Sequence, residues 1–138
     1  MKSFRVRYTA GFTPGPMTIW VHRRYGPGSA CVVPGPGVGD APALPGVVAG
    51  KGYALIEIEF DGVRFVFASL AELGVFREVL GRPLLPRPQG LDPARVRRYA
   101  NSHWLSRLPA KAKPWRYRRR LVRYLDTIDA SVRAAWQA

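Results

Sequence analysis

The side chains with the clearest chemical potential in this sequence are cations gathered in one segment. Residues 82–123 carry thirteen Lys and Arg against a single acid, Asp92, whereas residues 1–81 carry eight against six. Most of the formal net charge of +13 therefore comes from that segment. A positive field this concentrated attracts polyanions such as nucleic acid, an acidic protein surface or anionic lipid. Eighteen of the 22 cations are Arg, whose planar guanidinium suits bidentate contacts to phosphate.

The densest part of that segment is KAKPWRYRRRLVRYL, residues 111–125, which divides into two faces when projected on a helix. We expect Pro114 to open this helix, which continues to about residue 136. The predicted core face holds Tyr117, Leu121, Tyr124, Leu125, Ile128, Val132, Ala135 and Trp136. The opposite face holds Arg116, Arg119, Arg120 and Arg123, with Trp115 near its edge. We expect Arg118, at the border between the faces, to pack its stem and extend its guanidinium to solvent.

The basic segment lacks the acids that normally accompany arginine on a solvated helix. No Asp or Glu occurs between Pro93 and Leu125, although Glu near Arg relieves repulsion and supports a helix. A merely solubilising face is the alternative, but it gives no reason to omit Glu. We therefore expect a small, non-enzymatic protein that contacts the phosphate backbone of DNA or RNA through Arg-rich C-terminal helices. The residues predicted to bind nucleic acid are Arg116, Arg119, Arg120, Arg123, Lys111, Lys113, Trp115, Arg95, Arg97 and Arg98.

Two other functions fit the same composition. One is a protein-interaction module, an inhibitor or adaptor of phage or mobile-element origin, that docks its basic face on an acidic protein or ribonucleoprotein. The other is a metal-independent ribonuclease that uses His22 or His103 in general acid–base chemistry. The position of His103 on an apolar helical stripe predicts a buried imidazole. We expect His22 on the outer face of a strand, where it would join Arg5 and Arg7 in a second basic patch.

The carboxylates of residues 57–61 form the most acidic cluster of the sequence. Glu57 and Glu59 share one face of a predicted strand, but we expect Glu59 to pair with Arg64 and Asp61 to serve the adjoining turn. No His or Cys group has the spacing of a metal site. The sequence therefore predicts neither a metal nor another cofactor.

Residues 53–68 predict a β-hairpin. Asp61-Gly62 lies between two β-rich runs and is typical of a two-residue turn. Across such a turn Phe60 faces Val63, and the pairs continue outward along both strands. The resulting register places one apolar face toward a core, with the pairs Phe60–Val63, Ile58–Phe65 and Ile56–Phe67.

The remaining elements are predicted from the alternation of apolar and polar residues and from the positions of Gly, Pro and helix-capping residues. Residues 3–9 and 17–24 alternate apolar and polar side chains, which predicts two more strands. Residues 25–52 hold eight Gly and five Pro and predict a long irregular loop, with ACVV (residues 30–33) as a possible short strand. Ser69 followed by Glu72 is a capping box for a helix over residues 69–80, with Gly81 as its stop.

The predicted fold is α+β and a single domain. A small, mainly antiparallel sheet with one packed helix occupies residues 1–81, a Pro-rich connection covers 82–91, and a basic helical half covers 92–138. We expect Asp92 and Pro93 to start the first helix of that half, and the last helix to dock on the sheet or on its predecessor. One cysteine, Cys31, leaves no intramolecular disulfide. No window approaches about eighteen apolar residues, so we expect a cytoplasmic protein without a membrane partner.

Overall fold

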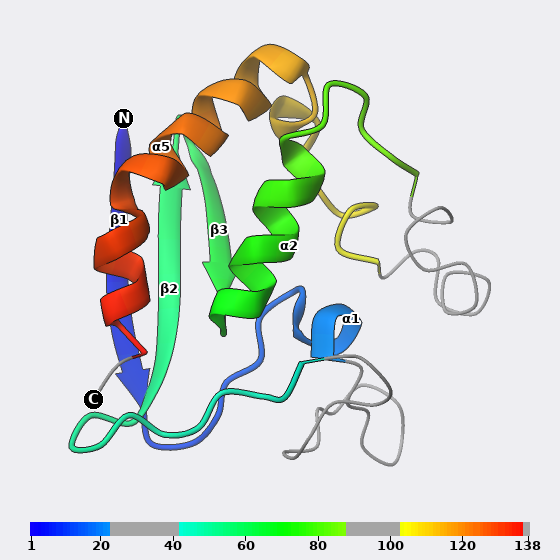
Figure 1. The fold of residues 1–138 in the computed structure, drawn as a ribbon. Helices are drawn as coiled ribbons and strands as arrows, with labels where there is room; N and C mark the ends of the chain where they lie inside the picture. The colour runs from blue at the N-terminus through cyan, green and yellow to red at the C-terminus, as the bar shows by residue number, and fades with distance from the viewer. Residues whose placement is uncertain (23–41, 88–102, 137–138) are drawn as a thin grey trace.

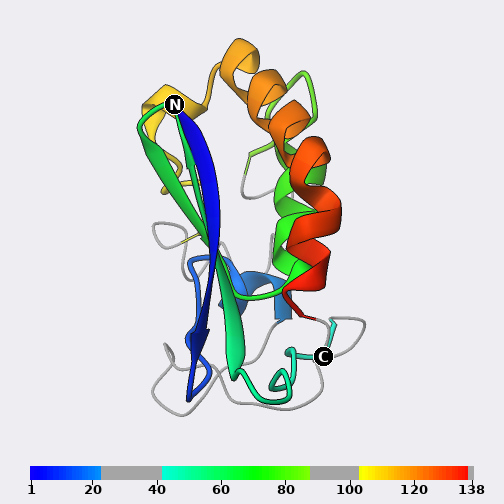
Figure 2. The ribbon, with the colours of Figure 1, turned by 90° about the vertical axis from the view of Figure 1, so that its left-hand side faces the viewer.

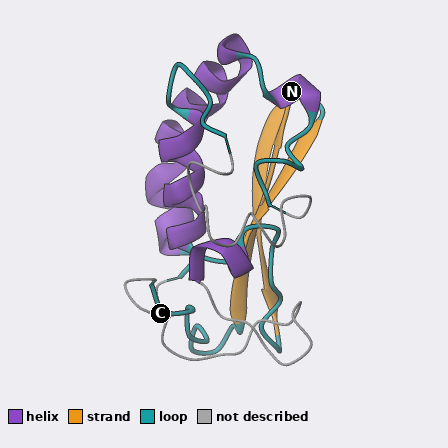
Figure 3. Ribbon diagram, turned by 90° about the vertical axis from the view of Figure 1, so that its right-hand side faces the viewer, coloured by secondary structure: helices purple, strands orange, loops and turns teal. Residues whose placement is uncertain are grey.

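The computed structural model describes residues 1–22, 42–87 and 103–136. Its elements in chain order are β1 (Lys2–Thr9), α1 (Thr18–His22), β2 (Tyr53–Phe60), β3 (Val63–Phe67), α2 (Leu70–Leu80), the 3-10 turn η2 (Ala110–Ala112) and α5 (Trp115–Ala134). The three strands form one antiparallel sheet in the order β1-β2-β3. Helices α2 and α5 lie side by side on one face of that sheet (Figures 1 and 2). This two-layer arrangement confirms the predicted α+β class and is seen again from the opposite side in Figure 3.

The hairpin formed by β2 and β3 has the predicted register. Phe60 pairs with Val63, and the pairs Ile58–Phe65 and Ile56–Phe67 follow. Asp61 and Gly62 both have positive φ, 47° and 86°, which a tight two-residue hairpin turn requires. All six paired apolar side chains are buried beneath the helices, and they form the centre of the core.

Strand β1 completes the sheet along the other edge of β2. Phe4 lies opposite Ile58 and Val6 opposite Ile56, so the apolar side of the predicted strand also faces the helices. The alternate residues of β1, Arg5 and Arg7, point to the outer face, which no described helix covers (Figure 2). The period of two therefore assigns the cations of β1 to the side of the sheet away from the core.

The prediction of a strand over residues 17–24 is wrong, because the described part of this stretch forms the short helix α1. Met17, Trp20 and Val21 stand at positions i, i+3 and i+4 and are all buried. A run this short fits both a period of two and a single helical turn, so alternation alone does not distinguish them. The helical turn also buries His22, whereas a strand would have exposed it.

Helix α2 begins as the capping box predicts. The Ser69 hydroxyl accepts a hydrogen bond from the Glu72 backbone N–H at 3.1 Å, and Gly81 is the C-cap. The Glu72 carboxylate is buried and accepts from the Ala68 N–H at 3.1 Å. Both ends of the helix thus have partners for backbone groups that would otherwise be unsatisfied.

Helix α5 docks on the sheet and on α2. The Tyr117 hydroxyl donates to the Phe60 carbonyl at 2.6 Å, and the Tyr8 hydroxyl donates to the Ala135 carbonyl at 2.9 Å. Two hydroxyl groups near the ends of the helix therefore fix its position across β1 and β2. The predicted core face is confirmed, with Leu121 and the side chains that follow it on that face packed into the core.

Several predicted elements fall outside the described residues. They include the possible strand at 30–33, the first part of the 25–52 loop and the helix start at Asp92. The described part of that loop, residues 42–52, is irregular apart from a bridge between Val48 and Gly52. In the ranges the structure covers, we find no helix with the length and apolarity needed to cross a bilayer.

Candidate nucleic-acid interface

Five exposed cations lie just before α5 and along its first half. We call Lys111, Lys113, Arg116, Arg119 and Arg123 the α5 basic face. Within residues 1–22, 42–87 and 103–136, none of these five side chains forms an ion pair with a carboxylate. The three arginines are spaced i, i+3 and i+7, so they follow one line along about 10 Å of the helix axis.

The start of α5 adds to this positive field. Its N-cap residue is Pro114, with no side-chain capping hydrogen bond, and its first turn contains no acid. The first backbone N–H groups of a helix have no intrahelical partner and carry the positive end of the helix dipole. Arg116 is placed where the dipole disfavours a cation by some tenths of a kcal/mol. An anion bound here would relieve that repulsion.

Arg120 belongs to the predicted surface but has a structural partner. It pairs with Asp61 at 2.8 Å, and its guanidinium lies over the Phe60 ring, 5.4 Å from the centroid. Asp61 also accepts from the Met1 amino group at 3.2 Å. The amino terminus and Arg120 together lower the pKa of the Asp61 carboxyl. Arg120 therefore anchors α5 to the hairpin turn. Because it is paired with Asp61, we do not count it in the α5 basic face.

The expectation that Arg118 extends to solvent is wrong, because its side chain is only 3% exposed. Its Nε donates to the Lys113 carbonyl at 2.7 Å, and its terminal nitrogens donate to the carbonyls of Leu80, Arg82 and Pro83. The carbonyls of Leu80, Arg82 and Pro83 belong to the end of α2 and the chain that follows it. A cation is favourable at the negative end of a helix dipole, so Arg118 fastens α5 to the C-terminus of α2. Burial lowers the pKa of the guanidinium.

Trp115 covers this buried arginine. The Arg118 guanidinium lies 5.1 Å from the centroid of the indole ring, and the side chain of Trp115 stays 36% exposed. A cation–π contact of this kind engages part of the aromatic surface. Trp115, which the sequence predicts to bind nucleic acid, therefore has a structural role in addition to any contact with a ligand.

The second half of α5 differs from the first half because it contains acids and its charged side chains form ion pairs. Asp126 and Asp129 both accept from Arg77 of α2, and Asp129 also accepts from Arg133 at 2.8 Å. The hydrogen bonds from Arg133 and Arg77 lower the pKa of Asp129. Asp126 lies three residues after Arg123, but its carboxylate is turned to α2. In the described part of the chain, the unpaired cations of α5 are therefore confined to its first half.

Both histidines are buried. The prediction for His103 is confirmed: its side chain is 1% exposed, and its Nδ1 accepts from the Leu105 N–H at 3.0 Å. The prediction for His22 is wrong, because it is fully buried beside Ser69, with Nε2 2.8 Å from the hydroxyl oxygen. Neither imidazole reaches solvent, so neither is positioned to meet a ribonuclease substrate.

His22 belongs to a buried polar network at the N-terminus of α2. Its Nδ1 is 3.0 Å from the Pro42 carbonyl, and its Nε2 is 3.4 Å from a carboxylate oxygen of Glu72. That oxygen also accepts from the Thr18 hydroxyl at 3.0 Å. Burial by itself would lower the pKa of His22, but the interactions with Glu72 and the Pro42 carbonyl outweigh it and raise the pKa. The network joins α1, α2 and the loop before β2.

A second basic cluster surrounds Glu57 on the outer face of the sheet. The Glu57 carboxylate accepts from Arg5 at 2.7 Å, from Arg7 at 2.8 Å and from Arg64. The expected partner of Arg64, Glu59, is its neighbour across the strands, but the guanidinium reaches the buried carboxylate diagonally instead. Burial by itself would raise the pKa of Glu57, but the hydrogen bonds and charges of Arg5 and Arg64 outweigh burial and lower the pKa.

The structure brings together only part of the predicted surface. Arg95, Arg97 and Arg98 lie outside the described residues. The sequence pointed to Arg5 and Arg7 as a patch, but it missed Arg64 as their partner around Glu57. Across the described ranges, no group of three His, Cys, Asp or Glu side chains is arranged to hold a metal ion. Comparison of the chain with protein-family models, curated proteins and solved structures finds no match.

Proposed function

We propose that this chain binds nucleic acid without transforming it, and that the α5 basic face contacts the phosphate backbone. The observation that carries the proposal is the charge distribution in the first half of α5 and just before it: five exposed cations without a carboxylate partner in the described part of the chain. The fold does supply acids for other arginines, Arg77 and Arg120 among them. Leaving these five unpaired favours a function that uses them.

Salt dependence follows from the number of cations in the face. Each phosphate neutralised on duplex DNA contributes about −0.9 to the slope of log affinity against log salt. Five contacts predict a slope of about −4.5, so binding weakens about 500-fold between 50 and 200 mM salt. A protein that recognised bases alone would show a much smaller dependence.

The test removes the three helical cations and leaves the anchors in place. We expect the R116Q/R119Q/R123Q variant to keep its circular dichroism spectrum and melting temperature, because all three side chains are exposed. Its affinity for DNA and RNA oligonucleotides, measured by fluorescence anisotropy, should fall at least tenfold at low salt. The salt slope should become shallower by about 2 to 3 units.

A matched control removes the same charge elsewhere. The variant R82Q/R87Q/R133Q loses three exposed arginines outside the α5 basic face. We expect a smaller loss of affinity and a salt slope close to that of the unchanged protein. Equal losses of affinity in the two triple variants would show that affinity depends only on net charge and not on the α5 basic face. Failure of the unchanged protein to bind any nucleic acid at low salt would refute the proposal and favour an acidic protein partner.

A further inference from the structure

In the described part of the chain, a pocket of about 280 Å³ opens beside β3. Three aromatic side chains that are distant in sequence and mostly buried in the core line it: Phe65 of β3, Phe76 of α2, and Trp104 before η2. The ring centroids of Phe65 and Phe76 are 5.1 Å apart, and those of Phe76 and Trp104 are 6.0 Å apart. Two exposed arginines, Arg64 and Arg107, also line the pocket. Aromatic walls with guanidinium groups beside them suit a planar ring that is joined to an anionic group such as a phosphate.

The size and position of the pocket restrict its occupant. Sites for drug-sized ligands measure about 300–1,000 Å³, so this pocket has room for a single ring system. Residues 64–67 of β3 all line it, and β3 is one of the two edge strands of the described sheet. An edge strand presents backbone N–H and C=O groups to its surroundings. Such groups along β3 can act as hydrogen-bond partners for the polar edge of a ring.

Arg64 connects this pocket to the cluster around Glu57. It also lines a hollow of about 280 Å³ on the outer face of the sheet, together with Arg5 and Glu59. The Glu57 carboxylate holds three guanidiniums in fixed positions, and each guanidinium has five N–H donors. One carboxylate leaves most of those donors available. The cluster contains three arginines and two acids, Glu57 and Glu59, so it is a preorganised cationic surface with a net charge of +1.

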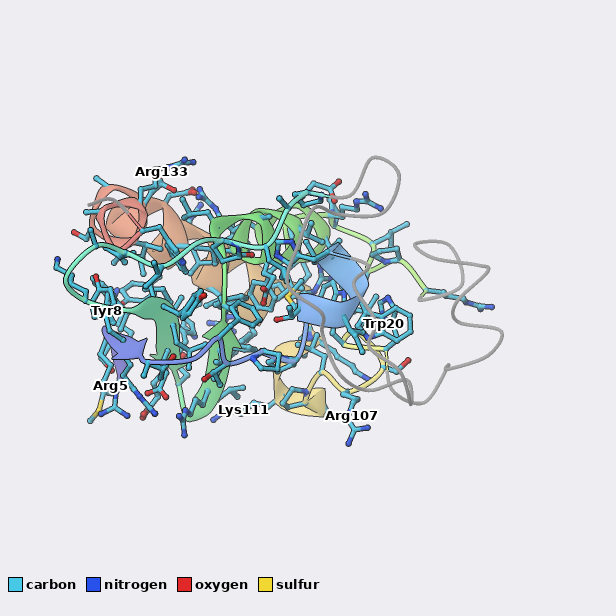
Figure 4. All side chains as sticks on the ribbon, turned by 90° about the horizontal axis from the view of Figure 1, so that it is seen from below. Arg5, Tyr8, Trp20, Arg107, Lys111 and Arg133 are labelled. Carbon is cyan, nitrogen blue, oxygen red and sulfur yellow. The ribbon has the colours of Figure 1, made fainter. Side chains whose placement is uncertain are left out.

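Lys111 links the outer face of the sheet to the α5 basic face. A side chain built at Gly62, in the hairpin turn, would lie 3.2 Å from the Lys111 ammonium nitrogen. Figure 4 shows Arg5, Lys111 and Arg107 extending on the side of the sheet away from α2 and α5. The cations therefore continue from the start of α5, past the hairpin turn, to the pocket beside β3.

We infer that the ligand is a single-stranded nucleic acid and that the pocket beside β3 accepts one of its unpaired bases. The inference rests on the proposed function and adds the substrate class to it. A base inside a duplex is stacked and paired, so it cannot enter a pocket unless it is first flipped out. In this arrangement the base packs against Phe65 and Trp104, while neighbouring phosphates contact Arg64 and the cations around it.

The test compares three ligands of equal length on the full chain: a single-stranded oligothymidine, the corresponding abasic strand, and a duplex. We expect the oligothymidine to bind at least fivefold more tightly than the abasic strand, because base stacking on aromatic side chains is worth about 5- to 100-fold. We also expect it to bind more tightly than the duplex. Quenching of tryptophan fluorescence by oligothymidine, absent with the abasic strand and reduced in W104F, would report contact with Trp104 separately from the exposed Trp115.

Two variants assign the effect to the pocket. W104F keeps an aromatic ring in the core and should lower affinity for the single strand at least threefold more than affinity for the duplex. W136F, which changes a tryptophan outside the pocket, is the matched control and should affect both ligands alike. The melting temperature of each variant checks that the core is intact.

The possible outcomes separate the two proposals. If all three ligands bind with affinities within twofold of one another, the inference about the pocket is refuted and the proposed function stands. That result would indicate that the pocket binds a different ring, such as an aromatic side chain of a protein partner. If none of the three binds, both proposals are refuted.

Discussion

Replacing Arg118 by Met tests whether the buried guanidinium holds α5 and α2 together. Methionine keeps an unbranched stem of similar length, so the change removes mainly the charged hydrogen-bond donors. The Leu80 carbonyl is buried and would lose the donor that Arg118 supplies at 3.1 Å. A buried carbonyl without a partner costs about 1–3 kcal/mol.

The other three acceptors are only partly buried, which limits their contribution. The carbonyls of Lys113, Arg82 and Pro83 can be rehydrated, so each lost hydrogen bond contributes about 0.5 kcal/mol. We expect R118M to lower the free energy of unfolding by about 3 kcal/mol in total. For a chain of this size that corresponds to a fall of about 10 °C in melting temperature.

The assay is urea and thermal unfolding followed by circular dichroism, with R119M as the matched control. Arg119 is the next residue of the same helix and is exposed, so its replacement should change the unfolding free energy by less than about 0.5 kcal/mol. R118K should give an intermediate loss, because one ammonium group cannot reach all four carbonyls. If R118M and R119M have the same stability within about 1 kcal/mol, Arg118 does not hold the two helices together.

The polar network and one glycine give two further predictions. Because the folded state raises the pKa of His22 above 6.5, its protonation stabilises the fold fully below that pH, and this contribution is lost as the pH rises through the raised value. The unfolding free energy should fall over that range, and H22Q should flatten the slope; an unchanged pH profile would contradict the assignment. Gly52 has a φ of 117°, and an added Cβ would lie 2.6 Å from the Thr9 carbonyl oxygen. G52A should therefore destabilise the fold by about 2 kcal/mol or more, whereas G50A, at a φ of 76° with open space around it, should cost about 1 kcal/mol; equal losses in urea unfolding would refute the steric reasoning.

The elements predicted correctly share a local cause. The hairpin register follows from the Asp61-Gly62 turn and the period of two, and both act within a few residues. The capping box of Ser69 and the apolar face of α5 are likewise determined by residues close in sequence. The strand predicted over 17–24 failed because a single turn leaves too short a pattern to distinguish the two periods.

The sequence by itself determined where the cations are concentrated and which helical face would carry them. Only the tertiary structure decided which cations remain available. Arg120 is paired with Asp61 of the hairpin turn. Arg118 is buried and donates a hydrogen bond to the carbonyl of Leu80, 38 residues away. His22 is enclosed by Ser69, 47 residues away. Such partners are chosen by the packing of distant segments, and local periodicity carries no information about them. The predicted face of α5 is thereby divided into anchoring arginines and a smaller set of unpaired cations.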